Sequence, residues 1–172
     1  MAMRGELLVR TGRPEEGCAL LKRAATLQKA EQNASFVSVY AGALAEGLAA
    51  TGSLEEALRT VEGAIADAEV RGAAFNLPEL RRVQGLLLVS RAPTDRRAGE
   101  EALSTAIELA RHHGALAWEL RATTSLARER LRRGGSRTAL RELAAVYASF
   151  TEGKETPDLR TAHDVLEGLV DP

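Results

Sequence analysis

The sequence predicts an all-α fold in which helical hairpins stack one after another, and three observations carry this prediction. First, the segment TGSLEEALRTVEGAIADA at residues 51–68 resembles TGRPEEGCALLKRAATLQ at residues 11–28, with 40 residues between the turn glycines Gly12 and Gly52. Second, apolar residues recur at steps of three and four, as on one face of a helix. Third, aromatic residues make up only 3% of the 172 residues, and the abundant Ala and Leu suit closely packed helices.

The clearest hairpin joins a helix at Phe36–Ala50 to a helix that begins at Ser53. Gly52 lies in the turn between them and can close the first helix in a left-handed conformation. Ser53 and Glu56 have the spacing of a capping box, which satisfies unpaired N–H groups at the start of a helix. Two helices joined in this way form an αα-hairpin. The expected apolar positions are Phe36, Val37, Tyr40, Ala41, Leu44, Ala45 and Leu48, then Leu54, Ala57, Leu58, Val61, Ala64, Ile65 and Ala68.

Three other hairpins follow the same pattern. The first turns at residues 11–14, where Pro14 suits the first turn of a helix because its missing N–H needs no partner there. The third joins a helix at Leu77–Val89 to one after residues 91–95, and the fourth joins a helix at Trp118–Leu131 to one after Gly134-Gly135-Ser136. Their second helices carry the apolar positions Cys18, Leu21, Ala24 and Ala25; Ala98, Ala102, Leu103, Ala106, Leu109 and Ala110; and Ala139, Leu140, Leu143, Val146 and Tyr147.

A variable period relates the four hairpins. Aligning Gly17, Ala57, Ala102 and Ala139 gives steps of 40, 45 and 37 residues, which is within the range of helical solenoids. A last helix at Asp158–Leu169 has a polar outer side, and we expect it to cap the stack, as such arrays require for solubility.

The predicted organisation is one domain over residues 1–172. Its repeats are expected at about 1–32, 33–73, 74–114 and 115–150, followed by a capping helix at 157–170. The first helix is short, because only about ten residues precede Gly12. Either the chain is a piece of a longer array, or its open N-terminal end meets another subunit.

These residues resemble the tetratricopeptide repeat (TPR) family. The resemblance lies in Ala45-x2-Leu48 on a first helix, Gly52 at the turn, and Ala57-x3-Val61-x2-Ala64 on a second helix. Leu126-Ala127 with Ala139-x3-Leu143-x2-Val146 fits the same template. The resemblance implies a right-handed superhelical solenoid of about four antiparallel helix pairs plus a C-terminal capping helix. A period above 34 and the lack of the family's usual Trp and closing Pro indicate a divergent, long-helix branch.

Longer segments look like the C-terminal repeat region of large bacterial signalling proteins of the adenylate cyclase, STAND ATPase or transcriptional regulator type. These segments are YAGALAEGLAATGSLEEAL, ELRRVQGLLL, ELRATTSLARERLRRGG and VYASFTEGKETPDLRTAHDVL. The cyclase and ATPase parts are not in this sequence, so the resemblance implies a regulatory, non-catalytic role.

Composition excludes several classes of partner. The formal net charge is −1, so no overall field favours nucleic acid or an anionic membrane. The longest apolar run, at residues 85–89, is far shorter than the roughly 20 residues of a transmembrane helix. The N-terminus lacks a secretory pattern, and the single cysteine, Cys18, cannot form an internal disulfide. We therefore expect a cytoplasmic protein with no membrane partner, and we regard nucleic acid as an unlikely one.

The sequence offers no catalytic or metal-binding residues and no cofactor site. His112 and His113 are adjacent on a helix, so their side chains diverge by roughly 100°. Cys18 lies among apolar residues and is expected to be a small buried hydrophobe. The acidic pairs Glu55-Glu56 and Glu100-Glu101 recur at helix starts, where negative charge is favourable. We therefore do not expect an enzyme.

The best candidate site is a peptide groove with a basic end. In the geometry that the TPR resemblance implies, the first helices of the repeats line a concave groove. The residues expected to line it are Glu46, Arg82, Arg121, Thr124, Arg128 and Arg132. The basic end comes from residues 128–133, which continue to Arg137 and Arg141, and the alternative is that these charges are simply solvated or complement a helix end.

The leading hypothesis is thus a non-catalytic scaffold that binds a protein or peptide and regulates a bacterial signalling system. A first alternative is a homodimer formed through the open N-terminal end. A second alternative is a small-molecule sensor with a pocket near Trp118, Tyr40 or Phe75.

Overall fold

A computed structural model describes residues 1–30, 35–72, 74–134 and 137–169, and within these ranges it contains nine α-helices. The predicted all-α fold is therefore confirmed. The α-helices are α1 Ala2–Arg10, α2 Pro14–Ala30, α3 Ser35–Ala50, α4 Leu54–Arg71, α5 Leu77–Arg91, α6 Arg96–His112, α7 Leu116–Leu131, α8 Arg137–Ala148 and α9 Pro157–Leu166. Two 3₁₀ turns, η1 Ala74–Asn76 and η2 Pro93–Asp95, precede α5 and α6. Phe36 and Val37 lie within α3, but the placement of their side chains, which were predicted to be in the core, is outside what the structure describes.

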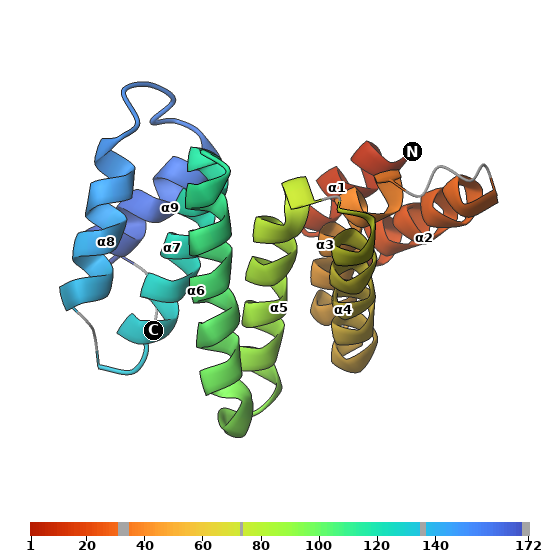
Figure 1. The fold of residues 1–172 in the computed structure, drawn as a ribbon, viewed down its shortest axis with the longest axis horizontal. Coiled ribbons are helices and arrows are strands. Elements are labelled where there is room, and N and C mark those ends of the chain that lie inside the picture. The colour runs from red at the N-terminus through yellow and green to blue at the C-terminus, as the bar shows by residue number, and fades with distance from the viewer. Residues whose placement is uncertain (31–34, 73, 135–136, 170–172) are drawn as a thin grey trace.

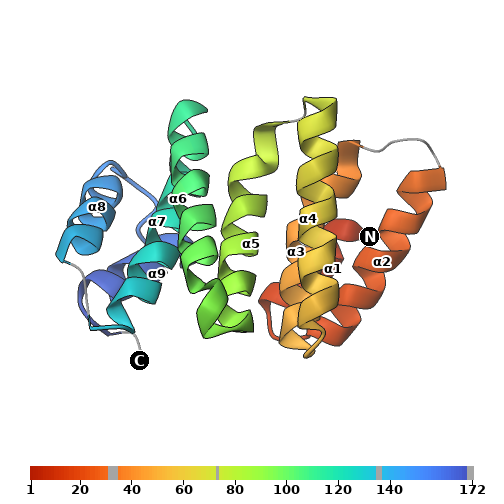
Figure 2. The same cartoon turned by 60° about the horizontal axis from the view of Figure 1, so that its bottom comes forward.

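The helices pack as antiparallel pairs that follow one another along the molecule (Figures 1 and 2). Helices α1 and α2, α3 and α4, α5 and α6, and α7 and α8 contact each other, and α9 packs against α7 and α8. The first helices also contact one another in series, from α1 to α3, α5, α7 and α9. Within the described part of the chain, the second helices make no comparable contacts with each other. The stack is therefore curved, with the first helices on its inner side.

Pairs of small residues let the two helices of each hairpin cross closely. A Cβ atom on Gly85 would lie 2.7 Å from Leu103 Cγ and 2.8 Å from the carbonyl oxygen of Gly99. Gly5 and Gly17 meet in the same way, since a Cβ on Gly17 would lie 2.8 Å from the Gly5 carbonyl oxygen. In the second and fourth hairpins the corresponding residues are the buried alanines Ala45, Ala57, Ala127 and Ala139.

These crossings correct the predicted alignment of the third repeat. The residue equivalent to Gly17 and Ala57 is Gly99, not Ala102, and the steps become 40, 42 and 40 residues. The step of 42 is the longest because 14 residues separate Gly85 from Gly99, whereas 12 separate Gly5 from Gly17, and η2 lies in the longer connection.

The helix ends follow the predicted glycine pattern but not the predicted cap. Gly12 and Gly52 have φ angles of +81° and +82° and close their helices in the left-handed conformation. Ser53 is the N-cap of α4, yet its side chain makes no cap hydrogen bond among the described contacts. Glu56 instead forms a salt bridge with Lys22 of the preceding hairpin, with 2.8 Å between Nζ and Oε1. The capping-box prediction is therefore wrong, because this carboxylate is used between hairpins.

Helix α9 covers the end of the stack. Its buried residues Leu159, Ala162 and Val165 pack into a core cluster with Leu120 and Leu143. The helix ends at Leu166, earlier than predicted, because Gly168 adopts φ +69° and the N–H of the next residue donates to the carbonyl of Asp164. Leu169 is consequently exposed rather than part of the apolar face. No helix in the described ranges is long and apolar enough to cross a membrane.

Candidate functional site

The structure brings all six predicted groove residues together. They line one hollow of about 370 Å³ on the inner side of the stack, which we call the inner groove. Its wall is formed by α3, α5, α7 and α9, so it is built only from first helices and the final helix. The lining residues are Glu46, Arg82, Leu86, Ser90, Arg121, Thr124, Ser125, Arg128, Glu129, Arg132, Asp158 and Thr161.

Arg82 is the most deeply buried charge of the groove. Its side chain is only 7% exposed, and its guanidinium donates to Glu46 Oε1 at 2.5 Å and to both carboxylate oxygens of Glu79 at 2.8 and 2.9 Å. Burial alone would lower the pKa of Arg82, but the two carboxylates outweigh it and raise this pKa. Arg82 thus links α3 to α5 through an ion pair, and its guanidinium stays charged.

Glu79 extends this linkage to the next repeat. The same oxygen that accepts from Arg82 lies 2.8 Å from Nη2 of Arg121 on α7, and Nε of Arg121 lies 3.7 Å from Asp158 on α9. Burial would raise the pKa of Glu79, yet the nearby guanidinium groups hold it below its ordinary value. We call the series Glu46, Arg82, Glu79, Arg121 and Asp158 the ion-pair chain. It joins four consecutive inner helices and orients two of the groove arginines.

The far end of the groove is less neutralised. Arg132 Nη1 lies 3.0 Å from Glu129, whose side chain is mostly buried. Arg128 is partly buried, and its guanidinium forms no hydrogen bond or ion pair with any described residue. The predicted basic end therefore consists mainly of one unpaired guanidinium.

Hydroxyl groups occupy the space between these charges. Thr124 Oγ1 donates to the Leu120 carbonyl at 2.7 Å, and Ser125 Oγ donates to the Arg121 carbonyl at 2.9 Å. Ser90 makes the same kind of bond within α5. Because these protons are used within the helices, the hydroxyl oxygens are available to a ligand as acceptors.

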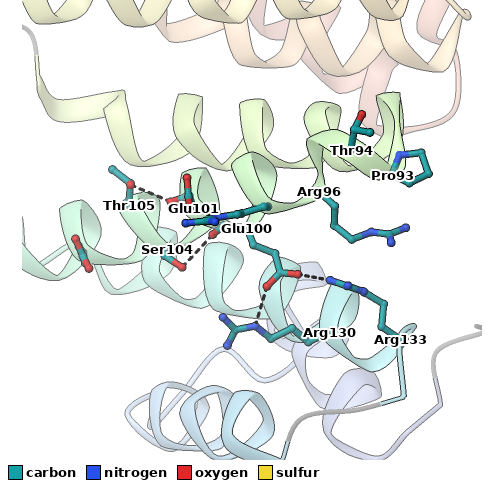
Figure 3. A pocket seen from close by; sticks show the side chains of 11 residues that line it. Pro93, Thr94, Arg96, Glu100, Glu101, Ser104, Thr105, Arg130 and Arg133 are labelled. Atoms are coloured by element: carbon teal, nitrogen blue, oxygen red, sulfur yellow. Dashed lines mark hydrogen bonds and ion pairs between the residues drawn. The ribbon is translucent and has the colours of Figure 1, made fainter.

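The arginine-rich segment at residues 128–133 divides between two sides of α7. Arg128 and Arg132 line the inner groove, whereas Arg130 and Arg133 reach toward α6 and line a second hollow of about 590 Å³, the α6–α7 pocket. Figure 3 shows the Glu100 carboxylate between the last two, with N–O distances of 3.3 Å to Arg130 and 2.7 Å to Arg133. The predicted single basic patch is therefore separated, because successive positions on a helix point in different directions.

The other reactive residue types are not assembled into a site. Cys18 is buried as predicted, and burial raises the pKa of its thiol, which disfavours the reactive thiolate. His112 and His113 are exposed neighbours at the end of α6. Among the described residues, no group of three or more His, Cys, Asp or Glu side chains could hold a metal ion.

The three aromatic residues proposed near a small-molecule pocket separate into two places. Phe75 and Trp118 contact each other with ring centroids 5.5 Å apart, and Phe75 is largely exposed. Tyr40 packs instead against a core cluster formed with Ala2 and Leu21. None of the three aromatic residues lines the inner groove or the α6–α7 pocket.

Sequence reasoning did not predict six of the lining residues, namely Leu86, Ser90, Ser125, Glu129, Asp158 and Thr161. Glu79 of the ion-pair chain was also missed. It lies behind the groove surface, so the pattern of exposed positions does not mark it. A signal was present, because Glu79 precedes Arg82 by three residues, and this spacing places two opposite charges on one helix face. The link to Arg121 has no such signal, since it depends on the packing of α5 against α7.

Comparison with known proteins shows the fold. A search of protein-family models found no match, and a search of curated proteins found none either. A solved structure with a similar fold comes from Podosopora anserina and is described as a kinesin light chain with nearly identical TPR-like repeats. The TM-score is 0.65 at 16% sequence identity, with 96% of this chain and 81% of the other covered. The chain therefore has a TPR-like helical-repeat fold.

Proposed function

We propose that this chain is a non-catalytic scaffold that binds a segment of a partner protein in the inner groove. The observation that carries the proposal is the convergence of six side chains from α3, α5 and α7 on one hollow. Their charges and hydroxyls are polar groups of the kind that orient a bound peptide.

The ion-pair chain supports this function by holding the groove in a prepared state. A flexible side chain that becomes ordered on binding costs about 0.5–1.5 kcal/mol. Arg82 and Arg121 are already held by carboxylates before a partner arrives, so little of this cost remains. A stack of hairpins also presents a long and semi-rigid surface on which modest contacts add up.

We take residues 1–172 as one domain, with each helix pair as one repeat and α9 as the cap. The segments that resemble repeat regions of bacterial signalling proteins support a regulatory role in such a system, in the cytoplasm. A protein partner is favoured over nucleic acid, because the groove mixes four arginines with three acidic residues and offers no aromatic platform for stacking bases.

Blocking the groove tests the proposal. A phage-displayed library of random nonapeptides is selected on the immobilised chain, and the enriched peptides are measured on two variants. Ser90→Trp places a large ring in the inner groove and is expected to weaken binding by about tenfold or more. Thr105→Trp is the matched control, because Thr105 lines the α6–α7 pocket and also bonds to the carbonyl four residues earlier. Equal binding by both variants, or no enriched peptide, would contradict the proposal.

Self-association is a second candidate function, and the exposed side of α1 favours it. Met3 and Leu7 lie one turn apart on this short helix, and their exposed fractions are 75% and 61%. A second copy that covered these side chains would bury both, and burial of each large apolar residue contributes about 1.5–3 kcal/mol.

Leu7→Glu is expected to abolish such self-association and to leave the monomer folded, since Leu7 is largely exposed. Sedimentation velocity of both proteins at several concentrations would measure this. Leu27→Glu, on the exposed surface of α2, is the control. A wild-type chain that stays monomeric at all concentrations would rule out the homodimer.

A further inference from the structure

We infer that the inner groove recognises an extended segment with one acidic residue and one basic residue three positions apart, rather than a run of acidic residues. The inference rests on the proposed function and specifies the partner. It follows from which charges of the groove are already neutralised and which are not.

Three of the four arginines of the groove already have carboxylate partners within the chain. Arg82 is held by two carboxylates, Arg121 lies between Glu79 and Asp158, and Arg132 is paired with Glu129. A polyanion would have to displace these internal partners and leave buried carboxylates without compensation, which is costly. Only Arg128 has no described partner. The groove therefore presents one guanidinium to a ligand, although four of them line it.

The ligand that suits Arg128 is a single carboxylate of the partner. A guanidinium binds a carboxylate through two parallel hydrogen bonds, which makes a single Asp or Glu side chain its natural partner. Arg128 is partly buried, so a pair formed there is less screened than one on an open surface. Glu129 is occupied by Arg132, so it does not compete for this position.

Asp158 offers a position for a basic residue of the partner. Asp158 is the most exposed acid of the groove, at 44%, and its distance of 3.7 Å from Arg121 is the longest in the ion-pair chain. Arg121 also pairs with Glu79 at 2.8 Å, so its charge is shared. The carboxylate of Asp158 is thus left under-compensated and accessible to a Lys or Arg of the partner.

The positions of Arg128 and Asp158 set the spacing between the two charges of the partner. Asp158 lies beside Arg121, which precedes Arg128 by seven residues on α7, or about 10.5 Å along the helix axis. In a polyproline II segment, residues three positions apart point the same way and are separated by about 9.3 Å. The two distances agree to within about 1 Å. An extended segment with this spacing therefore places one charge near Arg128 and the other near Asp158.

Selection and charge reversal test the inference together. Random nonapeptides are selected on the wild-type chain, on Arg128→Glu and on Arg133→Glu. The Arg133→Glu variant is the control, because Arg133 lines the α6–α7 pocket and its side chain is as exposed as that of the groove residue Arg132. We expect wild-type peptides to share one Asp or Glu with a Lys or Arg about three positions away. Selection on Arg128→Glu should replace the acidic residue with a basic one, and the Arg133→Glu control should keep the wild-type preference.

One enriched peptide is then synthesised with a fluorescent label, in its original form and with its acidic residue changed to Lys, and Kd is measured by anisotropy. The change is expected to weaken wild-type binding about tenfold, and Arg128→Glu should restore it to within about threefold. Arg128→Gln removes the positive charge without adding a negative one. It should bind the original peptide more weakly than the wild type does, and the Lys-substituted peptide more weakly than Arg128→Glu does. Poly-glutamate should compete at least about tenfold less well than the original peptide.

The outcomes separate the two proposals. Enriched peptides with acidic runs, or with an acidic preference that Arg128→Glu does not alter, would overturn this inference and leave the groove as the binding site. The absence of any enriched peptide on the wild-type chain would overturn the proposed function and this inference with it.

Discussion

Glu79→Gln is expected to lower the free energy of unfolding by about 3 kcal/mol, within the range for removing one partner of a buried ion pair. The side chain of Glu79 is only 18% exposed, accepts hydrogen bonds from Arg82 and forms an ion pair with Arg121. Gln keeps the size of the side chain but loses the negative charge, so two guanidinium groups remain close together with less compensation. Chemical denaturation monitored by circular dichroism would measure the loss.

The effect of this substitution should depend on pH in a stated direction. The pKa of Glu79 lies below its ordinary value in the folded chain, because the two guanidinium groups outweigh the effect of burial. Its carboxylate therefore stabilises the fold above an unfolded-state pKa of about 4.3, and this contribution disappears as the pH falls through the folded pKa. The difference between wild type and Glu79→Gln should accordingly be largest near neutral pH and shrink in acid.

Glu69→Gln is the matched control. Glu69 also pairs with an arginine of α5, with 2.6 Å to Arg81, but its side chain is 51% exposed. An exposed ion pair contributes at most about 1 kcal/mol, so this variant should unfold almost like the wild type. Equal stability losses at both glutamates would show that the ion-pair chain has no special part in holding the inner helices together.

Two glycine substitutions are expected to change stability in opposite directions. Gly85→Ala should destabilise the fold by about 1–3 kcal/mol, the usual cost of extra atoms in a closely packed region. The new Cβ would lie 2.7 Å from Leu103 Cγ and 2.8 Å from the Gly99 carbonyl oxygen. Helices α5 and α6 would therefore have to separate. Thermal unfolding of the variant and the wild type would show the loss.

Gly63→Ala is the control for the same change within a helix. Gly63 lies inside α4 and is exposed, and a Cβ added to it would have no described atom within 4 Å apart from its chain neighbours and the backbone of its own helix. Alanine is favoured over glycine in a helix interior by about 0.8–1.0 kcal/mol, so this variant should be more stable than the wild type. A Gly85→Ala variant that is also more stable would refute the close helix crossing.

Local sequence features predicted the helices and most of their ends. Apolar residues at steps of three and four mark a buried helix face wherever the helix packs, and glycines such as Gly12 and Gly52 mark turns through their own backbone freedom. The placement of Arg82, Arg121 and Arg128 in the inner groove could also be predicted, because the TPR template assigns faces to positions along a helix. Glu56 was misread, since its partner Lys22 belongs to another hairpin.

What the sequence by itself determined is the class of the fold, the order of the hairpins and six of the side chains that face the groove. These properties follow from interactions between residues near one another in the chain. Only the tertiary structure decided which charges remain available to a partner. Arg82 pairs with Glu46 of another helix as well as with Glu79 of its own, and Arg121 pairs with Glu79 and Asp158 of other helices, whereas Arg128 has no described partner. Pairing of this kind depends on how helices far apart in sequence pack together, and a pattern within one helix does not encode it.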